Sequence, residues 1–201
     1  MAHTLRVAVA VLTLAALTAT TSACTPKPEP TPSPTLTPST SPTTPTTTPS
    51  LSEQDQNIAA AKNAYLAYVA AYDAAAQAGF VNRDLTIAAF ELTSADAREA
   101  IVSVQTTFEQ NGLRQTGSTL VRALAVTEYQ ADSSGAGLHG AKLRACVEPS
   151  DTDTVFADGT STTPTDQPQY RGPRIVYVQM QRQPEGNWTV ANEDPRPEER
   201  C

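Results

Sequence analysis

A proline- and threonine-rich segment at residues 25–50 limits how much of this chain can fold. It holds nine of the chain's 16 prolines, no aromatic residue and one aliphatic residue, Leu36. Such a segment cannot bury enough apolar surface to offset the entropy lost on ordering. Proline favours an extended path of about 3.1 Å per residue, which gives the segment a reach of up to about 80 Å. We therefore predict a stalk, which leaves about 150 residues, the size of one ordinary domain.

The residues before the stalk have the three-part layout of a secretory signal. Arg6 and the amino terminus supply positive charge, residues 7–17 form an apolar run, and residues 19–23 are small. The apolar run is too short for a membrane-spanning helix, which needs about 20 residues. We expect residues 1–23 to be a signal peptide.

The motif Thr21-Ser22-Ala23-Cys24 resembles the bacterial lipobox. The resemblance implies that Cys24 carries a diacylglycerol, with palmitate as the expected acyl chain, and becomes the mature amino terminus. The chain would then be a lipoprotein at the extracytoplasmic face of the cell membrane. Thr21 departs from the usual aliphatic residue at the first lipobox position, so cleavage by ordinary signal peptidase and plain secretion is the alternative. The expected layout is a signal peptide (1–23), a lipidated cysteine with its stalk (24–51) and a folded domain (52–201).

Three cysteines are present, an odd count that calls for a special use of one of them. Lipidation of Cys24 leaves Cys146 and Cys201, and a disulfide between them would persist in an oxidising compartment. We predict this bridge, which would fasten a carboxy-terminal tail without recognisable pattern to a strand.

The formal net charge of −7 argues against a nucleic-acid partner, because phosphates attract Lys and Arg. An acidic domain also gains little from anionic lipid head groups. The charge is typical of a protein that stays in solution by self-repulsion.

Two well-marked helices open the folded domain. Ser52 is a suitable N-cap, and Gly79 can end the first helix. The apolar residues of this helix recur at helical spacing and form one stripe, whereas the polar residues fall on other faces. The stripe consists of Ile58, Ala61, Tyr65, Tyr68, Val69, Tyr72 and Ala75. The polar residues are Lys62, Asn63, Asp73 and Gln77. A short apolar piece follows at 85–90. A further helix begins after Thr93 or Ser94 and ends at Gly112.

After Gly112 the pattern changes to strands, at 118–129, 138–148, 175–182 and 188–191. The long polar segment 149–173 has room for a short strand at 154–156, and the tail from Glu193 has no pattern. Helices followed by about four antiparallel strands predict an α+β fold, with the helices packed on one face of a curved sheet.

This layout resembles the NTF2-like superfamily, a cone-shaped α+β fold also called cystatin-like or SnoaL-like. The resemblance covers residues 53–192 and rests on the three tyrosines of the first helix, on residues 143–148, and on residues 186–190. More narrowly, the chain is similar to short actinobacterial lipoproteins with a proline- and threonine-rich stalk. The resemblance implies a pocket between helix and sheet, and a homodimer, which such folds often form.

Four aromatic residues are candidates for the wall of such a pocket: Tyr65, Tyr68, Tyr72 and Trp188. The tyrosines share one helical face, which is more typical of core packing with the hydroxyls reaching partners. As pocket residues they would contact a small apolar ligand.

Some members of the superfamily are enzymes that need a pocket carboxylate or histidine as proton-transfer base. Asp73, Glu128, Glu148 and His139 are the available groups, and each is more typical of a surface residue. No metal-ligand spacing or cofactor motif is recognisable, so we expect no catalytic residues, no metal and no cofactor.

The leading hypothesis is therefore a membrane-anchored, non-enzymatic accessory domain that binds a small apolar ligand or an envelope protein. The rival is an isomerase- or cyclase-type enzyme that uses a pocket carboxylate. An enzyme should hold an ionisable group with a perturbed pKa in a cavity. A third option, recognition of an envelope protein by the exposed sheet face, predicts a contiguous apolar patch on that face.

Overall fold

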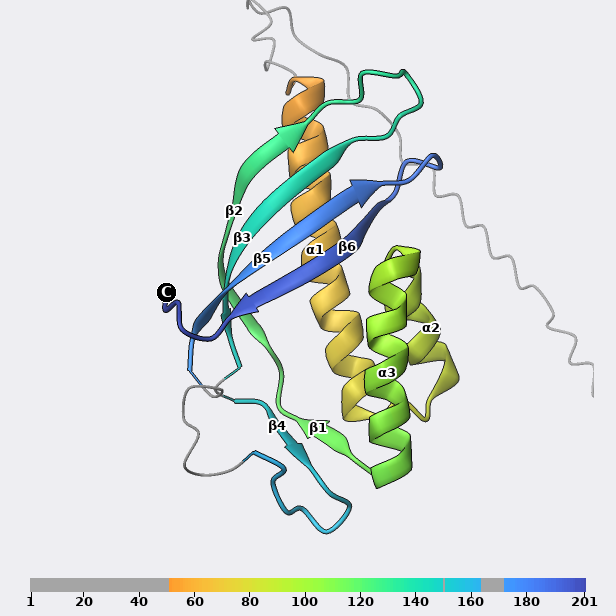
Figure 1. Cartoon of the computed structure of the whole chain (residues 1–201), viewed down its shortest axis with the longest axis vertical. Coiled ribbons are helices and arrows are strands. Elements are labelled where there is room, and N and C mark those ends of the chain that lie inside the picture. Colours follow the sequence, from red (N-terminus) through yellow and green to blue (C-terminus); the bar gives the residue numbers. More distant parts are fainter. Residues whose placement is uncertain (1–50, 150, 164–171) are drawn as a thin grey trace, which may run out of the picture. The chain divides into compact units, whose positions relative to one another are not determined.

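The structure, a computed structural model, describes residues 51–149, 151–163 and 172–201 (Figure 1). The predicted signal peptide, Cys24 and residues 25–50 of the stalk lie outside the described residues. Nowhere in the described ranges is there a helix with the length and apolar character needed to cross a membrane.

The described residues form an α+β fold, as predicted, with the helices first in sequence and the strands after them. The elements are α1 (Glu53–Gln77), α2 (Arg83–Glu91), α3 (Ala95–Asn111), β1 (Arg114–Thr116), β2 (Leu120–Gln130), β3 (Gly140–Glu148), β4 (Asp153–Val155), β5 (Arg174–Arg182) and β6 (Trp188–Arg196).

Helix α1 begins and ends where the sequence predicts. The Ser52 side chain accepts a hydrogen bond from the Asp55 backbone N–H at 3.1 Å, which satisfies one free donor of the first turn. At the other end, Gly79 adopts a left-handed φ of 65°, and the two residues after the cap donate back to Ala76 and Ala75. This pair of bonds is a Schellman motif, and it turns the chain toward α2.

Helices α2 and α3 are capped in the same way. Asn82 accepts from the backbone at the start of α2, and Ser94 does so for α3. Gly112 ends α3 in a left-handed conformation. The link between these helices, at Thr93, forms a parallel bridge with Val190 of β6, so α3 lies beside the edge of the sheet (Figure 1).

Four antiparallel strands form the main sheet in the order β2-β3-β5-β6. Alternate residues of β3 point at α1, which lies across one face of the sheet (Figure 1). The core is the layer between them; its largest fully buried side chains are Tyr65, Phe80, Leu143, Val178 and Val190. The other face of the sheet carries charged and polar side chains such as Lys142, Arg144 and Gln179.

The prediction of about four strands was incomplete. Strand β1 was assigned to no element, and it pairs with β4 in a separate two-stranded sheet. Strand β6 also continues to Arg196, through residues in which the sequence shows no pattern. Strand β5 supplies the pairing partner for this extension, so main-chain hydrogen bonds order a stretch whose side chains give no periodic signal.

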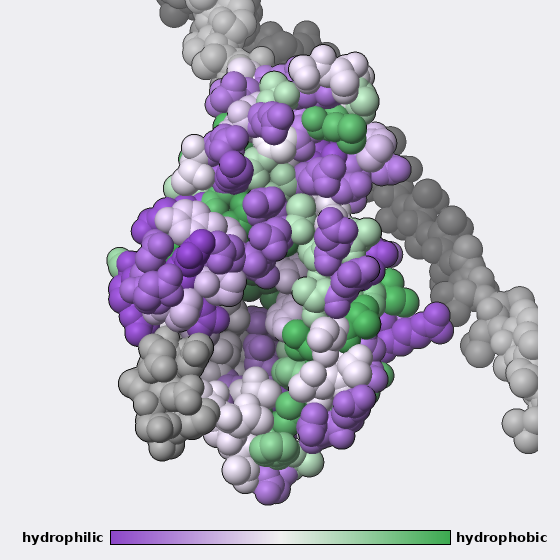
Figure 2. Space-filling view, viewed as in Figure 1, coloured by the Kyte–Doolittle hydropathy of each residue, from purple (hydrophilic) through white to green (hydrophobic). Residues whose placement is uncertain are grey.

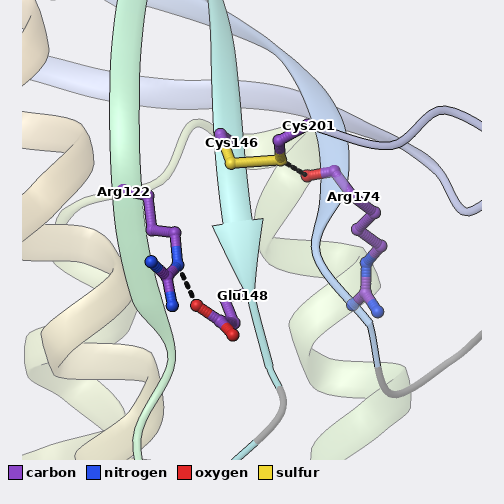
Figure 3. Close-up of polar contacts among 5 residues, drawn as sticks. All are labelled: Arg122, Cys146, Glu148, Arg174 and Cys201. Atoms are coloured by element: carbon purple, nitrogen blue, oxygen red, sulfur yellow. Dashed lines mark hydrogen bonds and ion pairs between the residues drawn. A yellow bond between two sulfur atoms is a disulfide. The ribbon is translucent and has the colours of Figure 1, made fainter.

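The predicted disulfide is present and joins Cys146 on β3 to Cys201, with 5.7 Å between their Cα atoms (Figure 3). It lies on the outward face of the sheet, where the Cys201 sulfur is 3.4 Å from the backbone oxygen of Arg174. Arg122 and Glu148 form an ion pair nearby, between β2 and β3 (Figure 3).

Candidate functional site

A cavity of about 420 Å³ separates α1 from the carboxy-terminal half of the sheet. Its walls come from α1, α3, β3, β5 and β6, and Figure 2 shows it as a hollow between the sheet and α3. The volume lies within the range typical of small-molecule sites, about 300–1,000 Å³.

Most of the cavity wall is apolar. Helix α1 contributes Val69, helix α3 contributes small and branched side chains, and the strands contribute valines. The residues from α3 and the strands are Ala97, Ala100, Ile101, Val104, Val147, Val176 and Val190. Apolar walls with few polar groups are typical of sites that bind an apolar ligand and orient it through one or two polar contacts.

A bulge in β6 places a carboxylate in this cavity. Ala191 has no partner on β5, because the pairing register shifts by one residue there. Strict alternation from the buried Val190 would put Glu193 on the outward face of the sheet. The bulge reverses the alternation, so Glu193 pairs with the buried Val178 on the face directed at α1.

Two tyrosines of α1 hold the Glu193 carboxylate. The Tyr65 hydroxyl donates to Oε1 at 3.2 Å, and the Tyr68 hydroxyl donates to Oε2 at 2.9 Å. Both rings are buried, which fixes the two donors. Glu193 itself lies deep between the helix and the sheet, yet its side chain is exposed because it borders the cavity rather than the packed core.

The surrounding protein raises the pKa of the Glu193 carboxyl by removing bulk water, whereas the hydrogen bonds from Tyr68 and Tyr65 and the charge of Arg174 oppose that rise. Because water reaches the side chain through the cavity, the effect of burial is smaller than for an enclosed carboxyl. Burial, and then the negative charge of Glu193, raises the pKa of both tyrosine hydroxyls. The hydroxyls therefore stay protonated and act as donors.

Tyr72 lines the same cavity one turn further along α1. Burial, together with the charges of Glu193 and Asp73, raises its pKa to about 12. No hydrogen bond to the Tyr72 hydroxyl is present within the described residues, which leaves this group available to a ligand.

Asp73 was predicted to be a surface residue on a face of α1 away from the core, and this prediction was wrong. Asp73 is buried and accepts hydrogen bonds from the Gln115 side chain and from the backbone and hydroxyl of Thr119. The segment between β1 and β2 covers this side of α1, so a position outside the apolar stripe becomes buried. Asp73 borders the cavity and at the same time fixes the connection into β2.

The other candidates from the sequence lie away from the cavity. Trp188 is a core residue, and its indole N–H is buried without a hydrogen-bond partner among the described residues. Glu128 and Glu148 pair with basic residues of neighbouring strands. His139 lies between β2 and β3, where its Nδ1 is 2.8 Å from the Tyr129 hydroxyl.

In the part of the chain that the structure describes, no three His, Cys, Asp or Glu side chains come together as metal ligands. The charged residues that line the cavity are Asp73, Asp96, Glu193 and Arg174, and Arg174 lines it from the start of β5.

Sequence reasoning found the three tyrosines but missed Glu193 and Arg174. Helical spacing groups Tyr65, Tyr68 and Tyr72 on one face, and this holds in the structure. Glu193 follows a bulge that has no glycine or proline to mark it, and it stands in a polar run without alternation. An acidic residue just after the strand that begins at Trp188 was the available signal.

Neither protein-family models nor curated proteins match this chain. Among solved structures, it is similar to a periplasmic fragment of TraM, with a TM-score of 0.42, 14% identity, and coverage of 67% of this chain and 96% of that chain. It is also similar to a protein from Novosphingobium aromaticivorans that is named as a proposed aromatic ring hydroxylase. That match has a TM-score of 0.42 and 16% identity, and it covers 72% of this chain and 96% of that chain. The match to the intermembrane space region of the chloroplast protein ARC6 has a TM-score of 0.36 and 13% identity, and it covers 67% of this chain and 95% of that chain. At such low TM-scores these likenesses carry no conclusion about function.

Proposed function

We propose that residues 52–201 are a non-enzymatic ligand-binding domain of NTF2-like architecture, held at the extracytoplasmic face of the cell membrane by a lipid on Cys24. The observation that carries the proposal is the cavity between α1 and the sheet, with apolar walls and one carboxylate that two tyrosines hold in place. The order of helices and strands, with the cavity on the helix-facing side of the sheet, supports the NTF2-like assignment.

Binding suits this site better than catalysis because of how the polar groups are used. Each oxygen of Glu193 already accepts a tyrosine hydrogen bond, which stabilises the ionised form and weakens the group as a base. The same bonds occupy Tyr65 and Tyr68, so these hydroxyls are not free to stabilise a developing oxyanion. A fixed carboxylate in an apolar pocket orients a ligand without needing to transfer a proton.

Recognition of a protein partner through the sheet face is a weaker reading. The described side chains on that face are largely charged or polar, and Figure 2 shows mostly hydrophilic surface over the strands. A sheet-face interface of the apolar type would need a contiguous apolar patch there.

The test of ligand binding is calorimetric titration of decanol into the full chain carrying Cys24→Ser, so that no lipid or detergent competes. Ala100→Trp places a large side chain in the cavity from an exposed position of α3, and we expect it to abolish binding. Ser103→Trp, at an exposed position of the same helix that does not line the cavity, is the matched control. Equal binding by both variants would refute the cavity as the site.

One observation favours an enzyme as the second candidate: Glu193 borders a cavity and its pKa is raised. In that case Glu193 is a proton-abstracting base and Tyr72 the free hydrogen-bond donor. The measurement is exchange of deuterium for hydrogen beside the carbonyl of a long-chain methyl ketone. Our proposal predicts no acceleration over buffer, whereas an acceleration that Glu193→Gln removes would establish the enzyme.

The membrane anchor rests on the motif at Cys24 and on the stalk that follows it. Mass spectrometry of the mature protein should find a diacylglycerol-modified amino-terminal cysteine. An unmodified Cys24, or a chain that begins at another residue, would leave a ligand-binding domain without this tether. The homodimer that the resemblance implies stays a prediction, which light scattering of the full chain can check.

A further inference from the structure

We propose that the cavity takes an elongated apolar ligand with an organic ammonium head group, which lies against Glu193. This inference rests on the proposed function, because it names the chemical class of ligand for the same cavity.

The charges on the cavity wall favour a cation. Three carboxylates line the cavity, from Asp73, Asp96 and Glu193, against the single guanidinium of Arg174. Asp96 is exposed in the first turn of α3, and Asp73 and Glu193 both accept hydrogen bonds from neighbouring side chains. Clefts lined by one sign of charge between low-dielectric walls concentrate ligands of the opposite sign.

Glu193 also presents its carboxylate in a suitable way. Tyr65 and Tyr68 each use one acceptor position of the carboxylate, one on each oxygen. A carboxylate has about four such positions, so two remain beyond those held by the tyrosines. The side chain is exposed to the cavity, which gives a head group room to reach it.

Tyr72 adds an aromatic surface beside this carboxylate. It is half-buried, lines the cavity, and has a ring centroid 6.1 Å from that of Tyr68. Aromatic rings attract ammonium groups through the negative potential of their faces, and desolvation in a pocket strengthens this attraction. A carboxylate beside a partly exposed tyrosine therefore suits an ammonium head, while the valines and alanines of the wall suit its apolar tail.

Arg174 is the feature that argues for an anionic head group instead. It lines the cavity from β5, and its charge interacts with that of Glu193. With three carboxylates on the wall against this one guanidinium, the lining of the cavity is net negative. The experiment below separates the two head groups directly.

The pH dependence follows from the groups that face Glu193. These are the tyrosine hydroxyls of Tyr65, Tyr68 and Tyr72 on α1 and the guanidinium of Arg174 on β5, with Asp73 and Asp96 further along the wall. The tyrosine hydroxyls stay protonated because burial raises the pKa of each, and the Arg174 guanidinium stays charged. The pKa of Glu193 is raised, and an ammonium ligand binds the ionised form, so affinity should increase as pH rises.

The experiment compares decyltrimethylammonium, decanol and decanoate by calorimetry with the full chain carrying Cys24→Ser. The two ionic probes are kept below their micelle concentrations, and decanol below its solubility limit. We expect the ammonium to bind about tenfold more tightly than decanol or better, equivalent to about 1.4 kcal/mol, and decanoate to bind most weakly. The quaternary head cannot titrate, so any rise in affinity with pH reports the protein. Glu193→Gln should remove the preference for the ammonium and keep decanol binding. Asp194→Asn, on the same strand with its charge pairing with Arg196, is the control and should change neither.

Two results would overturn the inference: decanoate binding as tightly as the ammonium, or an ammonium preference that survives Glu193→Gln. Failure of the proposed function itself has a different outcome, in which none of the three probes binds, or all bind equally well to the Ala100→Trp variant.

Discussion

Replacing Cys146 and Cys201 by serine removes the link that closes a 55-residue segment of the chain. In the chain-entropy model, closing a loop of that length restricts the unfolded state by about 14 cal/mol/K, or ~4 kcal/mol at room temperature. For a domain of about 150 residues, this corresponds to a fall of roughly 12 °C in Tm.

The folded state should change little, because the tail has other attachments. Ile175 donates its backbone N–H to Glu199 at 3.0 Å, and the Tyr177 hydroxyl donates to the Glu199 side chain at 3.2 Å. The loss is therefore expected from the gain in freedom of the unfolded chain, with strand β6 still paired in the folded one.

The assay is guanidinium unfolding followed by the fluorescence of Trp188, the chain's single tryptophan, which is 4% exposed. The reference carries Cys24→Ser, which makes the same chemical change outside the described domain. A loss below about 1 kcal/mol would refute the reasoning, since the loop would then be restricted by other means in the unfolded state. If the fluorescence of the folded variant before unfolding differed from that of the reference, the bridge would instead be holding the native tail in place.

Leu143→Ala should lower the unfolding free energy by about 3 kcal/mol, because the side chain is fully buried in β3. Val102→Ala is the control and should cost less than about 0.5 kcal/mol, because Val102 is 45% exposed on α3. Equal losses for the two variants in urea unfolding would contradict the assigned core. Gly79→Ala should cost several kcal/mol more than Gly112→Ala, although both have a left-handed φ, because a Cβ at Gly79 would lie 2.8 Å from a backbone oxygen while Gly112 faces open space. The raised pKa of Glu193 means that the folded state holds its proton more tightly than the unfolded state does. The unaltered chain should therefore lose stability as pH rises above about 4.5 and Glu193 ionises. Glu193→Gln cannot ionise at this position, so its stability relative to the unaltered chain should rise over the same range. A stability difference that stays constant with pH would show that Glu193 titrates normally.

The parts of the fold that the sequence predicts are those whose signals are local. Ser52 and Ser94 cap their helices as predicted, and Gly112 ends α3. The alternation of β3 and β5 predicts their buried faces correctly, because one face of each strand packs against the helices. The Cys146–Cys201 bridge followed from counting thiols rather than from geometry.

The parts that escaped prediction depend on pairing between distant segments. Strand β1 has three residues, and its order comes from β4, about 40 positions further along the chain. The end of β6 borders a cavity on one face and solvent on the other, so it has no reason to alternate. Glu193 enters the site only because Ala191 bulges, and a bulge of one ordinary residue leaves no mark in the sequence.

A crystal structure of the domain grown with decyltrimethylammonium would test the central claim most directly. The cavity account predicts the alkyl chain between α1, α3 and β6, with the ammonium within contact distance of the Glu193 carboxylate. A cavity filled by protein side chains, or a probe bound only elsewhere on the molecule, would contradict it.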